Sequence, residues 1–308
     1  MNSLTRNMFL SSLIFLLSSL LVGRELEVLA ADGRKYDMSE FPNMVVTEFI
    51  KGKAHKVEAG KVLQSWAAYG KCHEVWLTQE GTSIVCGTKG IWKYDGTNLR
   101  EVFFEPKKAS MEIHTCQPLD NGDLLVAVNG PKVILELSTE GKIKKMIKVP
   151  YLRSEARLQI SSVRKLDDGG YLFAASGDNK IFVINSKGVI KRTIDLSNLQ
   201  EPYQAKRIHS AEMMDNGNII VGTGYGACLL EIDPEDNIVW SLTPDDIPQL
   251  GIRYVGGFAV KSNGNLIVAA YNSAFPLFEI NRDKRIVWRL RRNRSEGIDK
   301  PVNLSLYD

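Results

Sequence analysis

Cysteine is scarce in this chain, and its cysteines stand far apart. Four occur among 308 residues, with no CxxC pair and no zinc-binding spacing: Cys72, Cys86, Cys116 and Cys228. A disulfide-framework miniprotein is therefore excluded. Each cysteine lies in or beside an apolar, strand-like run, so we expect buried free thiols.

Net charge is also low. With 39 Lys and Arg against 36 Asp and Glu, the formal charge is +3, which gives no electrostatic case for a nucleic-acid partner. The GxSxG, HExxH, P-loop and Rossmann motifs are all missing. The sequence therefore offers no ready-made catalytic signature, although its 44% hydrophobic content is that of an ordinary globular protein.

Long apolar runs are missing except at the start of the chain. Residues 8–22 are free of charge and follow Arg6, and small or apolar side chains stand at Val28 and Ala30. This pattern predicts a signal peptide over residues 1–30 and a secreted or periplasmic protein. A retained N-terminal anchor is the alternative, although the run is shorter than the ~20 residues that span a bilayer. After cleavage we expect no membrane association.

An internal repeat organises the rest of the chain. Turn glycines follow one another at spacings of 41, 47, 48 and 47 residues, each between apolar, β-branched runs: Gly81, Gly122, Gly169, Gly217 and Gly264. Asn-Gly and Asp-Gly pairs are typical of hairpins with type I′ turns, in which both central residues have positive φ. Each glycine therefore predicts a hairpin.

A second predicted hairpin follows each first one, which gives four strands per repeat. Four-stranded units of 40–50 residues are typical of propeller blades. Five blades fill residues 72–290, and residues 44–66 with residues 301–307 supply a sixth. We therefore predict an all-β, six-bladed β-propeller over residues 44–308, closed by strands from both termini and preceded by a linker over residues 31–43. A β-sandwich or an open array of hairpins is the alternative. The protein is expected to be a monomer.

Three tryptophans recur at one position of the repeat, on the last strand of a blade. They are Trp66, Trp240 and Trp288. We expect them to fill the gaps between neighbouring blades.

Two strings give the repeat a family resemblance. "EIDPEDNIVW" (residues 231–240) and "EINRDKRIVW" (residues 279–288) resemble the PQQ-like repeat, and the layout is similar to secreted bacterial PQQ-like or NHL-like six-bladed propellers. The quinone enzymes of that group have larger propellers and a calcium site. No Asp, Glu and Asn cluster for calcium is evident here, so a PQQ cofactor is not expected.

A second resemblance concerns residues 208–223, "IHSAEMMDNGNIIVGT", which are similar to the H-x-N-S repeat of bacterial arylsulfotransferases. Those six-bladed, exported proteins use histidines at the centre of the ring. The chain departs from that repeat, because Ser210 follows His209 directly and the asparagine is missing.

Histidines recur at one place in the repeat. His73, His114 and His209 each precede a turn glycine by eight residues, where the other blades have Ser161 and Gly256. Alignment of the closing strand by its apolar pattern gives Asn303 at this position. The symmetry of a propeller then predicts that these side chains surround one end of the central channel.

Several functions are open for the histidines at this position of the repeat. The three histidines are candidates to ligate a divalent metal, to act as catalytic groups on an anionic substrate, or to tie blades together. Basic and aromatic side chains are expected to surround them at the channel mouth: Arg153, Arg157, Arg207, Arg253 and Tyr254. We expect a binding module for a small anionic or carbohydrate ligand, or for a protein. The alternatives are an arylsulfotransferase-like or polysaccharide lyase-like enzyme and an inert scaffold.

Overall fold

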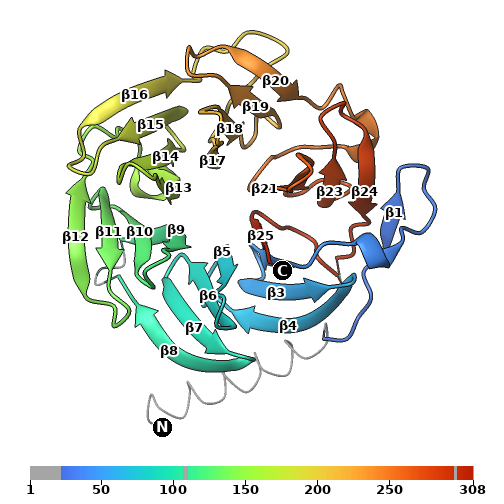
Figure 1. The fold of residues 1–308 in the computed structure, drawn as a ribbon, viewed down its shortest axis with the longest axis horizontal. Helices are drawn as coiled ribbons and strands as arrows, with labels where there is room; N and C mark the ends of the chain where they lie inside the picture. Colours follow the sequence, from blue (N-terminus) through green and yellow to red (C-terminus); the bar gives the residue numbers. More distant parts are fainter. Residues whose placement is uncertain (1–21, 107, 109, 295–296, 308) are drawn as a thin grey trace.

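The computed structural model describes residues 22–106, 108, 110–294 and 297–307, and these fold into six antiparallel sheets around a central axis (Figure 1). The prediction of an all-β, six-bladed propeller is confirmed. The innermost strands of the six sheets are β5, β9, β13, β17, β21 and β25, whose bounds follow (Figure 1).

Three blades follow one another in the first half of the chain. The first consists of β5 (Cys72–Leu77), β6 (Thr82–Gly87), β7 (Gly90–Asp95) and β8 (Asn98–Phe104). The second consists of β9 (Glu112–Pro118), β10 (Leu124–Asn129), β11 (Val133–Leu137) and β12 (Ile143–Lys148). The third consists of β13 (Ile160–Lys165), β14 (Tyr171–Ala175), β15 (Lys180–Ile184) and β16 (Ile190–Asp195). A short 3-10 helix, η2 (Ala156–Leu158), leads into the third.

The other three blades complete the ring. The fourth consists of β17 (Ser210–Met213), β18 (Ile219–Gly222), β19 (Leu229–Ile232) and β20 (Ile238–Leu242). The fifth follows η3 (Pro248–Leu250) and consists of β21 (Phe258–Val260), β22 (Leu266–Ala269), β23 (Leu277–Ile280) and β24 (Ile286–Leu290). In the sixth, β25 (Leu304–Leu306) pairs with β2 (Met44–Glu48), which is followed by β3 (Lys53–Glu58) and β4 (Lys61–Ala67).

The hairpin turns differ from the predicted type I′. At Gly122 the loop spans three residues, since Leu119 exchanges backbone hydrogen bonds with Asp123 and Gly122. Positive φ is confined to the glycine (φ 80°), and Asn121 before it has none. This is a type I turn closed by a left-handed glycine, the next most common hairpin loop. The hairpin was thus predicted at the right place but with the wrong turn type.

Tryptophans seal the gaps between blades, as predicted. Trp66 is 1% exposed and donates its indole N–H to the carbonyl of Gly96 in the neighbouring blade, at 2.7 Å. Trp240 donates to the carbonyl of Arg282 across the gap between the fourth and fifth blades, at 2.8 Å. Trp288 is fully buried against residues of the sixth blade. The four cysteines are likewise buried and free.

The segment before the sixth blade also packs onto the propeller. β1 (Val28–Ala30) pairs with β24 as a fifth, outermost strand, with Leu26 and Val28 buried in the core (Figure 1). η1 (Met38–Glu40) follows it. Most of the predicted signal peptide lies outside the described residues. Within the described ranges, no helix is long and apolar enough to cross a membrane.

Candidate functional site

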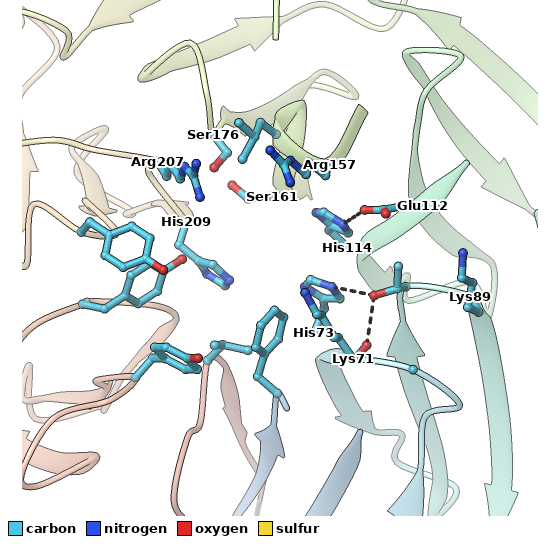
Figure 2. Close-up of a pocket in the computed structure, with 18 residues that line it drawn as sticks. Lys71, His73, Lys89, Glu112, His114, Arg157, Ser161, Ser176, Arg207 and His209 are labelled. Atoms are coloured by element: carbon cyan, nitrogen blue, oxygen red, sulfur yellow. Dashed lines mark hydrogen bonds and ion pairs between the residues drawn. The ribbon is translucent and has the colours of Figure 1, made fainter. Parts of the chain in front are cut away.

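A cavity of ≈ 470 Å³ opens at one end of the central channel (Figure 2). Its wall is built where the innermost strands begin and where the second and third strands of the blades are joined. His73 and His114 come from β5 and β9, and His209 precedes β17. The fold therefore brings together three histidines that are 41 and 95 residues apart in the sequence.

β-Bulges aim these side chains at the channel. In β5, Cys72 pairs with Gly87 and Glu74 pairs with Cys86, so His73 is an extra residue without a pairing partner. His114 is the extra residue of β9 in the same way. An extra residue bends its strand and re-aims its side chain. The blades thus use one local distortion to turn an inner-strand residue into the cavity.

Ser161 occupies the equivalent position in the third blade. It is left unpaired between Ile160 and Ser162 of β13, and it lines the same cavity. The eight-residue spacing before the turn glycine therefore marks one structural position.

Two of the histidines meet face to face. The rings of His73 and His114 stack with their centroids 4.1 Å apart and their planes 14° from parallel. The Nε2 atom of His114 lies 2.8 Å from Oε2 of Glu112, and Nε2 of His73 lies 3.2 Å from Oγ1 of Thr88 (Figure 2). Both rings are therefore held in place by a second group.

His209 reaches into the cavity separately (Figure 2). Its ring meets that of Tyr254 edge to face at 5.8 Å, and its side chain is only 8% exposed. Among the described residues, its buried Nδ1 atom has no hydrogen-bond partner. An unsatisfied buried polar atom of this kind costs about 1–3 kcal/mol.

Burial keeps two of these imidazoles neutral. It is the largest cause that lowers the pKa of His209 to about 3, helped by His114 and Arg164. It also lowers the pKa of His73 well below its ordinary value, helped by His114 and His209. Neutral imidazoles suit hydrogen bonding, as donor at one nitrogen and acceptor at the other. The hydrogen bond from His114, by contrast, lowers the pKa of Glu112 and keeps that carboxylate charged.

The histidines are not preorganised as a metal site. No group of three or more His, Cys, Asp or Glu side chains within the described ranges is arranged to hold a metal ion. The candidacy of His73, His114 and His209 as metal ligands stays a prediction. The planes of the His73 and His114 rings are 14° from parallel, so one or both rings would have to turn before their nitrogens could share one ion.

Cationic side chains surround the cavity mouth. Arg157 and Arg207, both predicted, line it together with Lys71 and Lys89. Arg207 has a left-handed backbone (φ 58°), which is unusual for a long side chain and is seen at functional sites. Glu112 is the single carboxylate among the described lining residues, and it already pairs with His114.

Three predicted residues do not reach the cavity. Arg153 and Arg253 are exposed, and they donate only backbone N–H groups, to Asp178 and to Ser273. Asn303 is displaced by one residue from the predicted position. Its side chain donates to Glu74 at 2.9 Å, and Val302 lines the cavity instead.

Below the cavity, a buried ion network crosses the channel. Arg164 of β13 lies 3.0 Å from Glu74 of β5 and 2.7 Å from Glu212 of β17. Glu74 also accepts from Asn303 and from the backbone N–H of Cys116. Burial raises the pKa of Glu74, while the Arg164 guanidinium opposes that shift. The network ties five of the six blades together across the axis.

Several lining residues were missed from the sequence, although a signal for them exists. The connections between second and third strands place a side chain in the cavity seven residues after the turn glycine, as at Thr88, Ser176 and Tyr271. A forward count from each glycine would have found them.

Comparisons with known proteins find the same fold and no sequence family. No protein-family model and no curated protein matches the chain. A structure of a protein of unknown function from Bacteroides caccae aligns at 20% identity with a TM-score of 0.73, covering 85% of this chain and 98% of that one.

Two lyase structures align as well. A structure of streptogramin B lyase aligns at 14% identity with a TM-score of 0.60. The alignment covers 91% of this chain and 87% of the lyase chain. A catalytically inactive histidine-to-alanine variant of virginiamycin B lyase from Staphylococcus aureus, with quinupristin, shares 13% identity at 0.58, covering 88% and 90%. At these identities the comparisons establish the six-bladed propeller fold alone.

Proposed function

We propose that this protein binds a small anionic organic ligand in the cavity at the channel mouth. The observation that carries the proposal is the charge of the wall: Lys71, Lys89, Arg157 and Arg207 face a cavity whose one described carboxylate is already paired. A volume of ≈ 470 Å³ lies within the range of small-molecule sites. Loops on a rigid scaffold are where binding sites concentrate.

The proposal is tested by a matched pair of double variants. Arg157→Gln with Arg207→Gln removes two cations of the wall. Arg153→Gln with Arg253→Gln removes two exposed arginines that lie outside the cavity. Binding of inorganic sulfate, phenyl sulfate and galacturonate is measured by calorimetry at low salt. We expect the cavity variant to lose affinity by about tenfold and the control to keep it.

The dependence of affinity on salt concentration is an independent test of the same binding. Because charges at an open mouth are screened, the affinity of the wild-type protein is expected to fall as ionic strength rises. Absence of binding by all three probes, or equal losses in both double variants, would contradict the proposal.

A catalytic role is the second candidate. His73 and His114 stack beside a paired carboxylate, and His209 offers a neutral imidazole with an unpartnered Nδ1. An imidazole paired with a carboxylate, as in His114 and Glu112, suits proton transfer on an anionic substrate, as in an arylsulfotransferase-like or a polysaccharide lyase-like enzyme. Two of the structurally similar proteins are lyases, one of them inactivated at a histidine. This support is analogy at the level of the fold.

The two candidates separate through His209→Gln, which leaves the cations in place. If the protein only binds, this variant changes affinity and no product forms from phenyl sulfate or oligogalacturonate with the wild-type chain. If the protein is an enzyme, turnover by the wild type is detectable and the variant loses it.

We also propose that the chain is exported, on the strength of the apolar run over residues 8–22 after Arg6. N-terminal sequencing of the protein recovered from a bacterial periplasm or medium checks this. An uncleaved chain in the membrane fraction would favour the anchor. The finer resemblance to PQQ-like or NHL-like proteins stays a proposal, and so does the expectation of a monomer.

A further inference from the structure

The cavity wall contains a continuous belt of rings. Neighbouring rings contact one another from one end of the belt to the other, in the order Tyr225, Tyr254, Tyr271, Phe49, His73 and His114. Centroid distances run from 4.1 to 5.8 Å. All contacts are edge to face except the stacked histidines. All six rings line the cavity.

The belt is open on one side. Five blades supply its rings, and the third blade supplies none among the described lining residues. Ser161 and Ser176 stand there instead, with Arg157 and Arg207 on the same side of the cavity (Figure 2). The wall is therefore divided into an aromatic part and a cationic, hydroxyl-bearing gap.

The two parts suit different portions of one molecule. Rings in contact with one another present faces and edges that pack well against a planar or pyranose ring. Two guanidinium groups suit a carboxylate or a sulfate, with which arginine forms paired hydrogen bonds. Arg157 already contacts Glu155 at 2.7 Å, but both side chains are more than half exposed, so that pair is weak and exchangeable.

His209 lies beside the belt and supplies a further contact. Its ring meets that of Tyr254, and its buried Nδ1 has no partner among the described residues. The ring itself lines the cavity, and the imidazole part that the cavity exposes suits a hydroxyl or an anion oxygen of a ligand that occupies both parts.

We infer that the cavity selects ligands in which one six-membered ring carries one carboxylate or sulfate, with the ring on the aromatic belt and the anion in the Arg157–Arg207 gap. This inference rests on the proposed binding function and adds the substrate class to it. The ring is that of an acidic sugar or that of an aryl group, and the two share the chemistry that the wall recognises.

Matched probes test the inference with the full-length chain. Phenyl sulfate carries ring and anion, phenol the ring alone, and inorganic sulfate the anion alone. Galacturonate, galactose and acetate form the corresponding sugar series. The ring-bearing anion of at least one series is expected to bind about tenfold or more tighter than either of its halves. The series with the larger gain assigns the ring as aryl or sugar.

Variants then locate the ring. Tyr254→Leu removes the ring with three neighbours in the wall, whereas Tyr254→Phe keeps it. We expect the leucine variant to weaken the ring-bearing anion by about 2- to 10-fold, with sulfate unchanged and the phenylalanine variant close to wild type. Tyr225→Leu, at the half-exposed end of the belt, repeats the test with little risk to folding.

The outcomes separate this inference from the proposed function. If sulfate and the ring-bearing anions bind equally well, or if the leucine variants weaken sulfate as much as the ring-bearing anion, the assignment of the belt is wrong while anion binding stands. If neither sulfate nor a ring-bearing anion binds, both fail.

Discussion

Three histidines of this chain are more than nine-tenths buried, and burial decides what they can do. His55 is fully buried, and His73 and His209 are 6% and 8% exposed. In each case burial is the largest cause of a lowered pKa. They share this property, but only His73 and His209 face the cavity. His55 serves as an internal comparison, because it lies in β3 and contacts Ser65.

His55 predicts a pH dependence of stability. Burial lowers its pKa from 6.5 to about 3 in the folded protein. Between those values the unfolded chain takes up a proton that the folded chain does not. The stabilisation is therefore complete above about pH 6.5 and is lost as the pH falls toward 3. Within that window the contribution of His55 is about 1.4 kcal/mol per pH unit.

Replacing His55 by Gln removes this titration. In urea denaturation at several pH values from 4 to 7, we expect the free energy of unfolding of the variant to depend less steeply on pH, by up to that slope. Identical slopes for the variant and the wild type would show that the imidazole is not neutral and buried as described.

At the scale of elements, the spacing of the turn glycines predicted the positions of the strands and hairpins correctly, whereas the residue types in the turns predicted the wrong turn type. The strands and hairpins follow from the turn glycines, because a hairpin needs a residue of permissive φ and apolar runs on both sides. The bulges at His73 and His114 could not be read from the sequence, since nothing in residue type marks an extra residue in a strand.

The closing strand shows how a one-residue alignment error misplaces a predicted site residue. Alternation in a strand has a period of two, so an alignment error of one residue turns a side chain to the other face. The apolar pattern selected Asn303, whereas Val302 lines the cavity and Asn303 contacts Glu74. With no turn glycine to anchor its short strand, the sixth blade gave no independent check on the alignment.

The strand β1 gives a prediction about the start of the domain. It covers the edge of β24, and Val28 within it and Leu26 just before it are buried, at 1% and 6% exposed. Burial of such side chains contributes about 1.5–3 kcal/mol each. A chain that begins at residue 31 is therefore expected to be less stable than one that begins at residue 23, by about 3–6 kcal/mol at most.

Guanidinium denaturation of the two purified chains measures this difference. The longer chain is the control for handling and for the loss of the residues before 23. Equal stability would mean that β1 contributes nothing to the propeller. The predicted cleavage site near Ala30 would then be compatible with the full stability of the domain.

At the scale of the whole molecule, buried ion pairs across the central axis stabilise the propeller in addition to the packing between blades. Arg164 is 6% exposed and Glu74 is 1% exposed, and each has its partner on another blade. Removing one member of a buried pair leaves the other charge without compensation, which costs about 3–5 kcal/mol. The sequence did not predict this network, because Arg164 is 48 residues from Glu212 and 90 residues from Glu74.

Arg164→Met is expected to destabilise the protein by that amount. Arg192→Met is the matched control, since Arg192 pairs with the half-exposed Asp236 near the rim. That control is expected to cost no more than about 1 kcal/mol. Adding Glu74→Gln to Arg164→Met is expected to restore part of the loss. Equal effects of the two methionine variants in thermal or urea denaturation would rule out a special role for the axial network.

The central claim is that the cavity at the channel mouth holds an anionic ligand by its cationic gap. The most direct test is a crystal structure of the protein with phenyl sulfate or galacturonate. The account predicts the anionic group at about 3 Å from the guanidinium groups of Arg157 and Arg207, with the ring against Tyr254. A ligand bound elsewhere on the propeller, or bound in the cavity with its anion away from both arginines, would contradict it.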